Sequence, residues 1–541
     1  MKIGIAQINT TVGDFYGNSQ KILQSYETLC RQGAEVVVFP ELVLCGYSPR
    51  DLLFKKRFVH DNDMALRALA AKIGEVPAII GCVRKISGKK GLFNSVAWCV
   101  DGKVQQFADK CLLPSYDVFD EKRHFTPAKE PTMVEYKGKR IGLTICEDIW
   151  TAKFSVEHYE YHIDPVALLA NTDVDFIFNF SASPWFFGKH ELRRKVAQAC
   201  AKRTKAPVIY CNLVGANDQV VFDGRSFVTN KKGEVIASME PFVEELQVVD
   251  TSGKPIKLTE PSEMQETHDA LVLGLRDYAH KSGFQRAVIG LSGGIDSAVV
   301  AVLAVEALGK ENVMGVSLPS SISSEHSKTD AQELALNLGI EFHTIPIQKI
   351  VSATEDVLKP LFKKRPRDTA EENMQARSRG MVLMSISNKF NAILLSTGNK
   401  SELAVGYCTL YGDMAGGLAV ISDVPKMKVY QLAKFMNRKK VLIPKNTISK
   451  APSAELAPDQ LDQDTLPPYP VLDEILRLYI EERKSSLEII AKGFDEIVVR
   501  DIVRRVDINE YKRKQSALGL KISPLAFGVG RRMPIVQKYV S

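Results

Sequence analysis

The chain has 541 residues, more than a single hydrophobic core usually supports, so we expect at least two domains. Hydrophobic residues make up 45% and charged residues 25%, which excludes a wholly disordered or fibrous protein. The formal charge of +7 comes without a long run of Lys and Arg, and no apolar run approaches the ~20 residues that span a bilayer. We therefore expect neither a nucleic acid nor a membrane as a partner.

The nine cysteines are scattered, with no CxxC pair and no Cys/His cluster at zinc spacing. This pattern argues against a disulfide scaffold and a structural zinc site, and it favours a reducing compartment. The N-terminal segment MKIGIAQINTTVGDF lacks the charged region and the long apolar region of a secretion signal. We expect a cytoplasmic protein.

The first half of the chain combines short apolar runs with helical patterns. Residues 2–8 alternate in polarity, residues 18–32 have helical spacing, and 34–41 form a nearly continuous apolar run typical of a buried strand. A long helical pattern covers 190–205. Further strands are expected at 76–82, 95–100, 140–146, 174–181, 206–212 and 225–230. Residues 1–250 are therefore predicted to form a layered α/β domain.

A polar segment with two prolines, residues 251–265, is predicted to be a linker, and a helix is expected from near His268. Strands and helices then alternate, with strands expected at 287–291, 312–319 and 341–347. This alternation predicts a Rossmann-like, doubly wound parallel sheet within residues 266–541. Residues 363–375 and 452–470 are expected to be loops that cover a site.

A glycine-rich loop follows the strand expected at 287–291. Its residues Ser292-Gly293-Gly294-Ile295-Asp296-Ser297 lead directly into a helical pattern. Adjacent glycines let backbone N–H groups converge, two serine hydroxyls add donors, and the helix N-terminus supplies positive potential. Together these features suit a phosphate. The alternative is a plain tight turn with a helix N-cap.

The loop lacks the Lys-Ser/Thr pair of a Walker A motif and instead resembles the SGGxDS signature of the pyrophosphatase-type ATP enzymes. That resemblance implies that ATP is cleaved between its α- and β-phosphates, and that Asp296 ligates Mg²⁺, which prefers oxygen donors. Glu402, in the later cluster TGNKSE, is the second candidate magnesium ligand; the alternative is an acid in the first turn of a helix. The resemblance implies that ATP is bound by Gly290, Leu291, Ser292, Gly293, Gly294, Ile295, Asp296 and Ser297, and the resemblance of STGNKSELAVGY at 396–407 to the NAD synthetases adds Thr397.

Four further segments resemble the NAD synthetases, in register and in order. They are NMQARSRG at 373–380, STGNKSELAVGY at 396–407, YGDMAGG at 411–417 and DTLPPYP at 464–470. The resemblance implies that deamido-NAD is bound by Asn373, Glu402, Asp413 and Lys512, with Asp413 near the nicotinate end. For Lys512 the alternative is a solvated basic surface, because YKRKQSALG is rich in Lys and Arg.

Three residues in the first half stand at expected strand ends: Glu41 after VVVFP, Lys110 in FADKCLLP and Cys146 in GLTICEDIW. Their order and surroundings resemble the nitrilase superfamily of carbon–nitrogen hydrolases, which implies an α-β-β-α sandwich. Taken singly, Cys146 fits a small buried hydrophobic residue, and Cys45 and Cys111 compete for the role of nucleophile. Neither of those two is followed by Glu-Asp at a strand end.

Amide hydrolysis by a cysteine requires these residue types. A neutral thiol is a poor nucleophile near pH 7, so Glu41 is expected to remove the proton as Cys146 attacks the amide carbon. Lys110 is then expected to stabilise the oxyanion. The resemblance further implies that Tyr116, Ser183 and Lys189 hold glutamine as the amide substrate.

An amidase and an adenylating domain on one chain indicate a coupled reaction, because an adenylated carboxylate must receive ammonia in a space shielded from water. The predicted function is the amidation of deamido-NAD to NAD by a glutamine-hydrolysing, ATP-consuming ligase, with AMP, pyrophosphate and glutamate as further products. An ammonia channel is expected for the same reason, and the family likeness suggests a homo-oligomer. The alternatives are another acceptor, such as a nucleotide-base precursor or a modified tRNA base, and a non-catalytic nucleotide-binding protein.

Overall fold

A computed structural model of the protein describes residues 1–88, 91–150, 161, 163–363, 365–453, 455–457 and 460–539. The chain divides into two compact units, Met1–Pro261 and Ser262–Ser541. Each unit has its own hydrophobic core. Among the described helices, none combines the length and the apolar character needed to cross a membrane.

The first unit contains two six-stranded sheets, with strand orders β14-β1-β2-β3-β4-β5 and β13-β12-β9-β8-β7-β6. The strands of one sheet are β1 (Lys2–Gln7), β2 (Val36–Val38), β3 (Ala78–Arg84), β4 (Phe93–Val100), β5 (Lys103–Asp109) and β14 (Glu245–Asp250). Those of the other are β6 (Thr132–Tyr136), β7 (Lys139–Ile145), β8 (Phe176–Ser181), β9 (Val208–Asn212), β12 (Phe227–Thr229) and β13 (Val235–Ser238). A separate pair is formed by β10 (Val214–Asn217) and β11 (Val220–Asp223).

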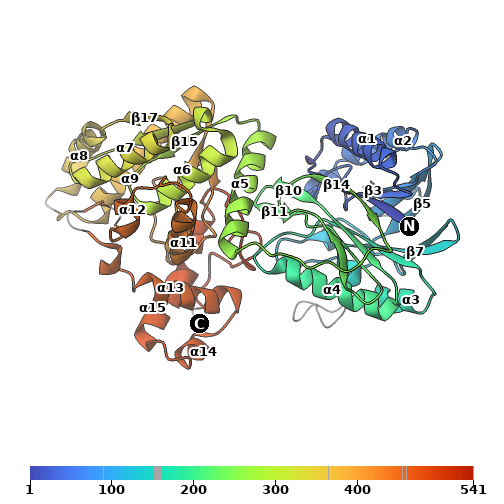
Figure 1. Ribbon diagram of the computed structural model, residues 1–541. Coiled ribbons are helices and arrows are strands. Elements are labelled where there is room, and N and C mark those ends of the chain that lie inside the picture. Colours follow the sequence, from blue (N-terminus) through green and yellow to red (C-terminus); the bar gives the residue numbers. More distant parts are fainter. Residues whose placement is uncertain are drawn as a thin grey trace. The chain divides into compact units, whose positions relative to one another are not determined.

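Side chains along these strands alternate between two apolar layers. In β2, Val36 and Val38 belong to the core between the two sheets, whereas Val37 packs in the layer beneath the helices. Figure 1 shows helices on both outer faces with the strands between them. The helices are α1 (Phe15–Arg31) and α2 (Lys56–Ala70) on one sheet, and α3 (Pro165–Ala170) and α4 (Lys189–Thr204) on the other. The predicted α-β-β-α sandwich is confirmed.

The second unit is built on a five-stranded parallel sheet with the order β17-β16-β15-β18-β19. The strands are β15 (Arg286–Gly290), β16 (Val313–Ser317), β17 (Glu341–Thr344), β18 (Ala392–Ser396) and β19 (Leu418–Ala419). The chain runs outward from β15 to one edge, then returns to add β18 on the other side. This is the predicted doubly wound topology, and its switch point lies between β15 and β18, where ligands bind in such sheets.

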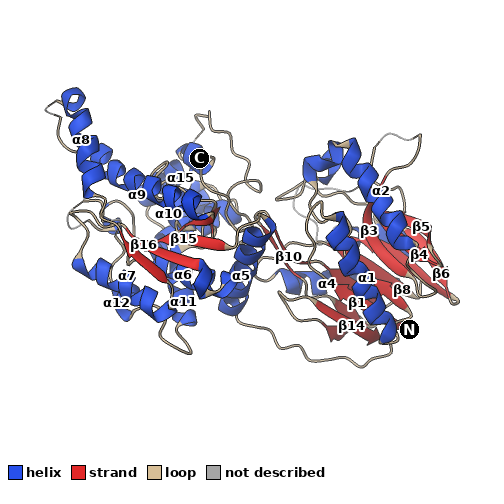
Figure 2. Ribbon diagram, turned by 90° about the horizontal axis from the view of Figure 1, so that it is seen from above, coloured by secondary structure: helices blue, strands red, loops and turns tan. Residues whose placement is uncertain are grey.

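Helices cover both faces of this sheet, as Figure 2 shows for α9 on one side of β15 and β16 and for α6 and α11 on the other. The helices around the sheet are α5 (Glu263–Lys281), α6 (Ile295–Leu308), α7 (Glu325–Leu338), α8 (Gln348–Phe362), α9 (Thr369–Phe390), α11 (Lys426–Met436) and α12 (Lys445–Ser449). A smaller helical group contains α10 (Lys400–Val405), α13 (Tyr469–Leu476), α14 (Ser486–Ile490), α15 (Glu496–Ile508) and α16 (Glu510–Arg513). Its apolar core joins Val405 of α10 to residues of α13, α14 and α15.

Two helix starts differ from the expectation. The loop predicted at 363–375 is wrong from Thr369 onward, because α9 begins there with a capping box: Ala370 N donates to Asp368, and Asp368 N donates to Glu371. The helix expected from near His268 begins earlier, at Glu263, because the Ser262 hydroxyl caps it by accepting from the backbone N–H of Gln265.

Candidate active sites

Glu41, Lys110 and Cys146 come together at the ends of strands from both sheets of the first unit. Glu41 lies beyond β2 and Lys110 beyond β5 of one sheet, while Cys146 directly follows β7 of the other. Lys110 Nζ donates to Glu41 Oε1 at 2.8 Å, and both side chains are almost fully buried. The Cys146 side chain is also buried, and its pKa responds to the charges of both neighbours. The three residues therefore share one buried site.

The charges in this site keep Lys110 protonated and Cys146 neutral. Burial disfavours the ammonium of Lys110, but Glu121 and Glu41 outweigh burial and hold its pKa well above the usual range. Burial, reinforced by Glu41, raises the pKa of the Cys146 thiol well above its usual value, against the opposing effect of Lys110. Cys146 is thus a thiol at neutral pH and needs a base to become a nucleophile.

Glu121 is a second carboxylate in this site that the sequence analysis missed. Its Oε1 accepts from Lys110 Nζ at 2.9 Å, and burial raises its pKa to about 7. Glu41 is oriented by two further donors, Asn94 Nδ2 at 2.7 Å and the backbone N–H of Ala182 at 2.9 Å. Lys110 therefore lies between two carboxylates, of which Glu41 is held in a fixed direction.

The turn that carries Cys146 is strained and firmly held. The φ of Cys146 is 46°, in the left-handed region that residues with side chains adopt only at a cost. Asp148 accepts three backbone N–H groups: Ile145 at 2.8 Å, Cys111 at 3.0 Å and Leu112 at 2.8 Å. One carboxylate thus ties the turn of Cys146 to the segment that follows Lys110.

The two competing cysteines have a different environment. Cys45 lies in an apolar cluster of the core, where burial raises its pKa to about 12. Cys111 is buried, and burial together with Asp148 raises its pKa above the usual range. Neither has the left-handed backbone of Cys146. The structure favours Cys146 over both.

Glu147, adjacent to Cys146, contacts Tyr116, one of the residues expected to hold glutamine. It is buried, and its Oε1 accepts from the hydroxyls of Tyr116 at 2.8 Å and Tyr161 at 3.0 Å. Burial raises the pKa of Glu147, while hydrogen bonding from Tyr116 and the charges of Lys110 and Lys189 oppose that rise. Glu147 was missed as a site residue, although its position beside Cys146 was visible in the sequence.

Ser183 lies on the segment between β8 and α4, and Lys189 lies where that segment enters α4. The Ser183 hydroxyl accepts from Arg193 Nε at 3.0 Å, and Arg193 is fully buried against Asp223 at 2.6 Å. Lys189, the first residue of α4, holds its Nζ 4.3 Å from the centroid of the Trp150 ring. Because β8 is the parallel neighbour of β7, its carboxyl end brings this segment towards Cys146.

The predicted loop joins β15 to α6 in the second unit, but only residues 291–294 lie outside both elements, and Ile295, Asp296 and Ser297 form the first turn of α6. Gly293 has a φ of +76°, and a Cβ there would lie 2.3 Å from the Ser327 carbonyl oxygen, so only glycine fits. The Ser297 hydroxyl donates to the Gly294 carbonyl at 3.0 Å, and Ser292 Oγ accepts from Gly294 N at 3.2 Å. The loop is therefore preorganised with the N-terminus of α6 behind it.

A cavity of about 680 Å³ opens at the switch point of the sheet. It is lined by Thr397 at the end of β18, by Asn373 of α9, and by Asp413 and Lys512. Every residue predicted to bind ATP or deamido-NAD except Gly293 lines this cavity. Sequence positions more than 200 residues apart thus meet in one space of ligand size.

Several polar groups in the cavity are held by neighbours. Asn373 Oδ1 accepts from Thr409 Oγ1 at 2.7 Å, and Lys512 Nζ donates to the carbonyls of Gly406 and Cys408 at 2.7 and 2.9 Å. Lys512 is therefore anchored at the cavity wall, which argues against the alternative of a freely solvated lysine. Burial raises the pKa of Asp413 to about 6, against the opposing effect of its backbone hydrogen bonds and Lys512.

Asp296 and Glu402 both bind the ammonium of Lys426, a residue that the sequence analysis missed. Lys426 Nζ lies 2.5 Å from Asp296 Oδ2 and 3.1 Å from Glu402 Oε1. Burial raises the pKa of Glu402 to about 7, and the charge of Lys426 opposes that rise. No local pattern marks Lys426, which is 130 residues from Asp296 in the sequence.

Comparison with known proteins accounts for both units. Residues 2–255 match the carbon-nitrogen hydrolase family and residues 267–516 match the NAD synthase family. A glutamine-dependent NAD(+) synthetase of Synechocystis sp. is 46% identical over 550 residues, which cover 99% of each chain. The chain belongs to the glutamine-dependent NAD(+) synthetases.

Two further relatives cover the same length. A glutamine-dependent NAD(+) synthetase of Thermotoga maritima is 43% identical over 580 residues, covering 100% of this chain and 99% of the relative. The solved structure of the glutamine-dependent NAD+ synthetase from Acinetobacter baumannii, in complex with ADP, is 39% identical with a TM-score of 0.78, covering 99% of this chain and 98% of the other. The predicted family, α/β class and enzyme class are confirmed, and a non-catalytic nucleotide-binding protein is ruled out as the alternative.

Proposed function

We propose that the protein converts deamido-NAD to NAD at the expense of ATP, with ammonia that it releases from glutamine. Residues 1–250 act as the glutaminase and 266–541 as the synthetase, and 251–265 connect them, with residues 263–265 already in α5. The observation that carries this proposal is the presence, on one chain, of a buried Cys–Glu–Lys site and of a phosphate-type loop that lines a ligand-sized cavity. Incubation with ATP, Mg²⁺, glutamine and deamido-NAD should yield NAD, AMP, pyrophosphate and glutamate; release of ADP and phosphate instead would contradict it.

Glutamine hydrolysis begins when the Cys146 thiol attacks the amide carbon while Glu41 takes its proton. Lys110, held between two carboxylates, presents its positive charge to the alkoxide that forms, and such preorganised stabilisation contributes roughly 3–4 kcal/mol. Glu41 then returns the proton to the leaving nitrogen, and ammonia departs. Water, activated by Glu41, hydrolyses the thioester to glutamate and restores the thiol.

Recognition of glutamine requires a cation for its α-carboxylate and an anion for its α-ammonium group. Lys189 supplies a cation for the α-carboxylate, and Tyr116 and Ser183 supply hydroxyl groups. We assign Glu147 as the anion for the α-ammonium, because it is buried, accepts the Tyr116 hydroxyl and lies next to the nucleophile. A buried carboxylate of this kind distinguishes an amino acid from a simple amide.

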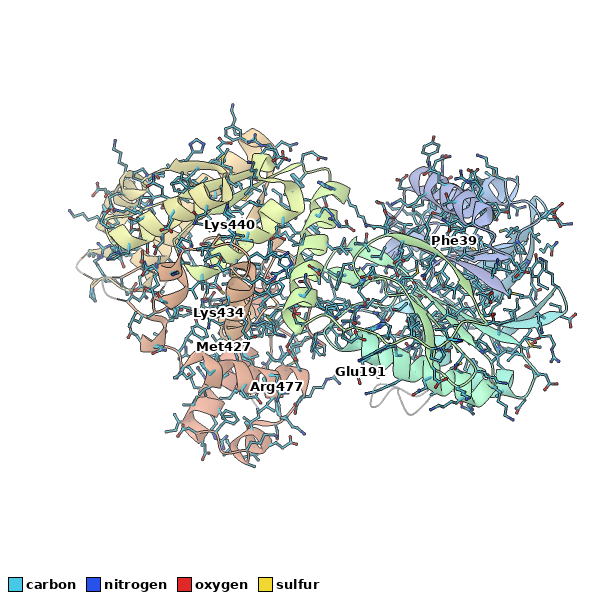
Figure 3. All side chains as sticks on the ribbon, in the orientation of Figure 1. Phe39, Glu191, Met427, Lys434, Lys440 and Arg477 are labelled. Atoms are coloured by element: carbon cyan, nitrogen blue, oxygen red, sulfur yellow. The ribbon has the colours of Figure 1, made fainter. Side chains whose placement is uncertain are left out.

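Glu147→Gln is expected to raise the KM for glutamine roughly 30-fold or more, because losing one partner of a buried charge pair costs about 2–5 kcal/mol. The kcat should fall less, and the variant should lose its preference for glutamine over glutaric acid monoamide, which lacks the α-ammonium. Steady-state glutaminase assays measure both. Glu191→Gln on α4, labelled in Figure 3, is the matched control, since that exposed residue pairs only with Lys195 among the ion pairs of the described residues. An unchanged KM in Glu147→Gln would count against the assignment.

The glutaminase kcat/KM of the wild type is expected to rise as pH increases through about 7, because burial raises the pKa of Glu121 to about 7. Above that pH Glu121 is charged and competes with Glu41 for the Lys110 ammonium. The Glu41 carboxylate is then less stabilised by that cation and becomes a stronger base. Glu121→Gln should lose this rise and be slower by roughly tenfold at pH 8. A pH–rate profile measured from pH 5.5 to 9 tests the point, and identical profiles for the two proteins would contradict it.

The synthetase half activates the nicotinate carboxylate of deamido-NAD. Residues Gly290 to Ser297 hold the β- and γ-phosphates while the carboxylate attacks the α-phosphorus. The pyrophosphate that is released stays hydrogen-bonded to the backbone N–H groups of this segment. Thr397 contacts ATP from the end of β18, while Asn373, Asp413, Lys512 and Glu402 hold deamido-NAD. Ammonia then attacks the acyl-adenylate, AMP leaves, and the amide of NAD is formed.

Asp296 and Glu402 fit a magnesium ion, because their carboxylates already converge on one cation, the Lys426 ammonium. Within the described residues no three Asp, Glu, His or Cys side chains gather as a metal-binding group. Two carboxylates with phosphate and water as the remaining ligands are typical of magnesium bound with a nucleotide. Bound there, magnesium supplies positive charge to the departing pyrophosphate.

The reducing compartment and the homo-oligomer remain predictions. All nine cysteines are free thiols, which fits a cytoplasmic enzyme. Apolar side chains are exposed on two neighbouring helices of the second unit, as expected for a face that a second copy covers: Val357 and Leu361 of α8, and Met381, Met384 and Phe390 of α9. Light scattering on the purified protein measures the oligomeric state.

A further inference from the structure

Lys426 fills the point at which two carboxylates of the synthetase cavity converge. Its Nζ lies within hydrogen-bond distance of Asp296 and Glu402, and its side chain is only 3% exposed. All three residues line the same cavity. The ammonium therefore occupies the position that a magnesium ion held by Asp296 and Glu402 would take.

The backbone that carries Lys426 is fixed, so its side chain is the part that can move. The Lys426 backbone N–H donates to Ser401 Oγ at 2.9 Å, and the Ser401 hydroxyl donates in turn to Asp473. The next residue, Met427, which Figure 3 labels on α11, donates its backbone N–H to the other oxygen of Asp473 at 2.9 Å. The first turn of α11 is thus anchored, and the flexible lysine side chain reaches the carboxylates from that anchor.

The ammonium and a magnesium ion cannot bind these carboxylates together. Magnesium needs its oxygen ligands at about 2.0–2.1 Å, and it would require the lone pairs that Lys426 now uses on both acids. The second oxygen of Asp296 is also engaged, since it accepts from Asn399 Nδ2 at 3.0 Å. Like charges a few ångströms apart would repel each other in addition. Metal binding therefore has to displace the ammonium.

The surroundings favour the ammonium as long as no other ligand is bound. Asp462, buried beside this group, accepts from the Tyr469 hydroxyl at 2.8 Å and adds a third negative charge that acts on Lys426. A lysine that leaves these acids without a new anionic partner loses a buried ion pair, which is costly. The binding of metal alone is weakened by this loss. When an anionic ligand binds in the same cavity together with the metal, that ligand becomes the new partner of the ammonium.

We propose that Lys426 is a positioning residue that holds Asp296 and Glu402 in place of the metal and competes with metal for them. The inference rests on the magnesium site proposed above. Its consequence is that a divalent cation alone binds the free enzyme weakly, so that the carboxylate pair is reserved for a metal that arrives with a phosphate-bearing ligand. Lys426 thus determines the order in which metal and phosphate-bearing ligand bind in the cavity.

Binding of Mn²⁺ alone, in the absence of any nucleotide, tests this on the full chain. Electron paramagnetic resonance measures free Mn²⁺ during a titration. Lys426→Met is expected to bind Mn²⁺ at least about tenfold more tightly than the wild type, because the competing cation is gone. Lys426→Gln should shift the affinity in the same direction, and Lys426→Arg, which keeps the charge, should stay close to the wild type. A merely structural role for Lys426 predicts weaker binding, since loss of the ion pair would loosen the carboxylates.

The controls separate this inference from the magnesium assignment itself. Thermal unfolding shows whether each variant is folded, and Lys426→Gln gives a second reading if Lys426→Met is not. Mn²⁺ binding to folded Lys426→Met and Lys426→Gln that is no tighter than to the wild type, but is lost in Asp296→Asn, would overturn the inference alone. Tight binding by Lys426→Met that persists when Asp296→Asn is added would overturn the magnesium assignment and the inference together.

Discussion

Cys146→Ala is expected to abolish glutamine-dependent NAD formation, by at least about 10⁴-fold, while NAD formation from added ammonium salts survives. The thiol is the only group in the first site that we assign to attack the amide carbon, and the cavity of the second unit does not include it. The measurement is the initial rate of NAD formation with each nitrogen source.

Cys30→Ala is the matched control, because Cys30 is a half-buried cysteine of α1 that takes no part in the proposed chemistry. That variant should match the wild type with both nitrogen sources. Loss of both activities in a folded Cys146→Ala protein would contradict the separation of the two sites.

Asp296→Ala is expected to stop NAD synthesis from either nitrogen source, by about 10³-fold or more, while glutamine hydrolysis remains measurable. Asp296 lines the cavity and binds the Lys426 ammonium, so its loss removes a proposed metal ligand and unpairs a buried cation. Release of pyrophosphate and formation of NAD are measured alongside glutamate release.

Asp501→Ala provides the comparison for that experiment. Asp501 pairs with Arg505 on the surface of α15 and does not line the cavity, so both activities should be retained. Unchanged synthesis in Asp296→Ala would discredit the proposed role of Asp296 with magnesium and phosphate.

Much of the architecture follows from hydrophobic patterning. Buried strands such as β8, with six consecutive buried residues, are evident in the sequence because Phe and Ile fill four of the six positions in FIFNFS and no charged residue interrupts the run. The expectations placed the end of β5 at Lys110 without giving the strand a range, and they missed β6, β10, β11, β13, β14 and β19. In β5 most side chains are exposed or half-buried, and KVQQFAD lacks a continuous apolar run. In β10 and β11 the strands are only four residues long, too short for a periodic signal.

The residues of the candidate sites also fall into two groups, those that local sequence reveals and those that only the fold brings into the site. Motif residues that follow strands, such as Cys146 and Asp296, are found from local sequence because strand ends meet at one edge of a sheet. Glu121 and Lys426 have no such signal: each reaches its partners only through the fold, across 11 residues to Lys110 and 130 to Asp296. The start of α9, by contrast, had a readable signal, since Asp368 and Glu371 form a capping box.

The nitrogen transfer itself is tested most directly with glutamine whose amide nitrogen carries a heavy isotope. The wild-type protein is supplied with this glutamine, deamido-NAD, ATP, Mg²⁺ and an excess of unlabelled ammonium, and the NAD formed is analysed by mass spectrometry. The label is expected in the carboxamide of NAD, in step with glutamate release, because the proposed reaction transfers ammonia from glutamine to the acyl-adenylate without mixing it with ammonium in solution. Glutamate release accompanied by NAD that carries only unlabelled nitrogen would contradict it.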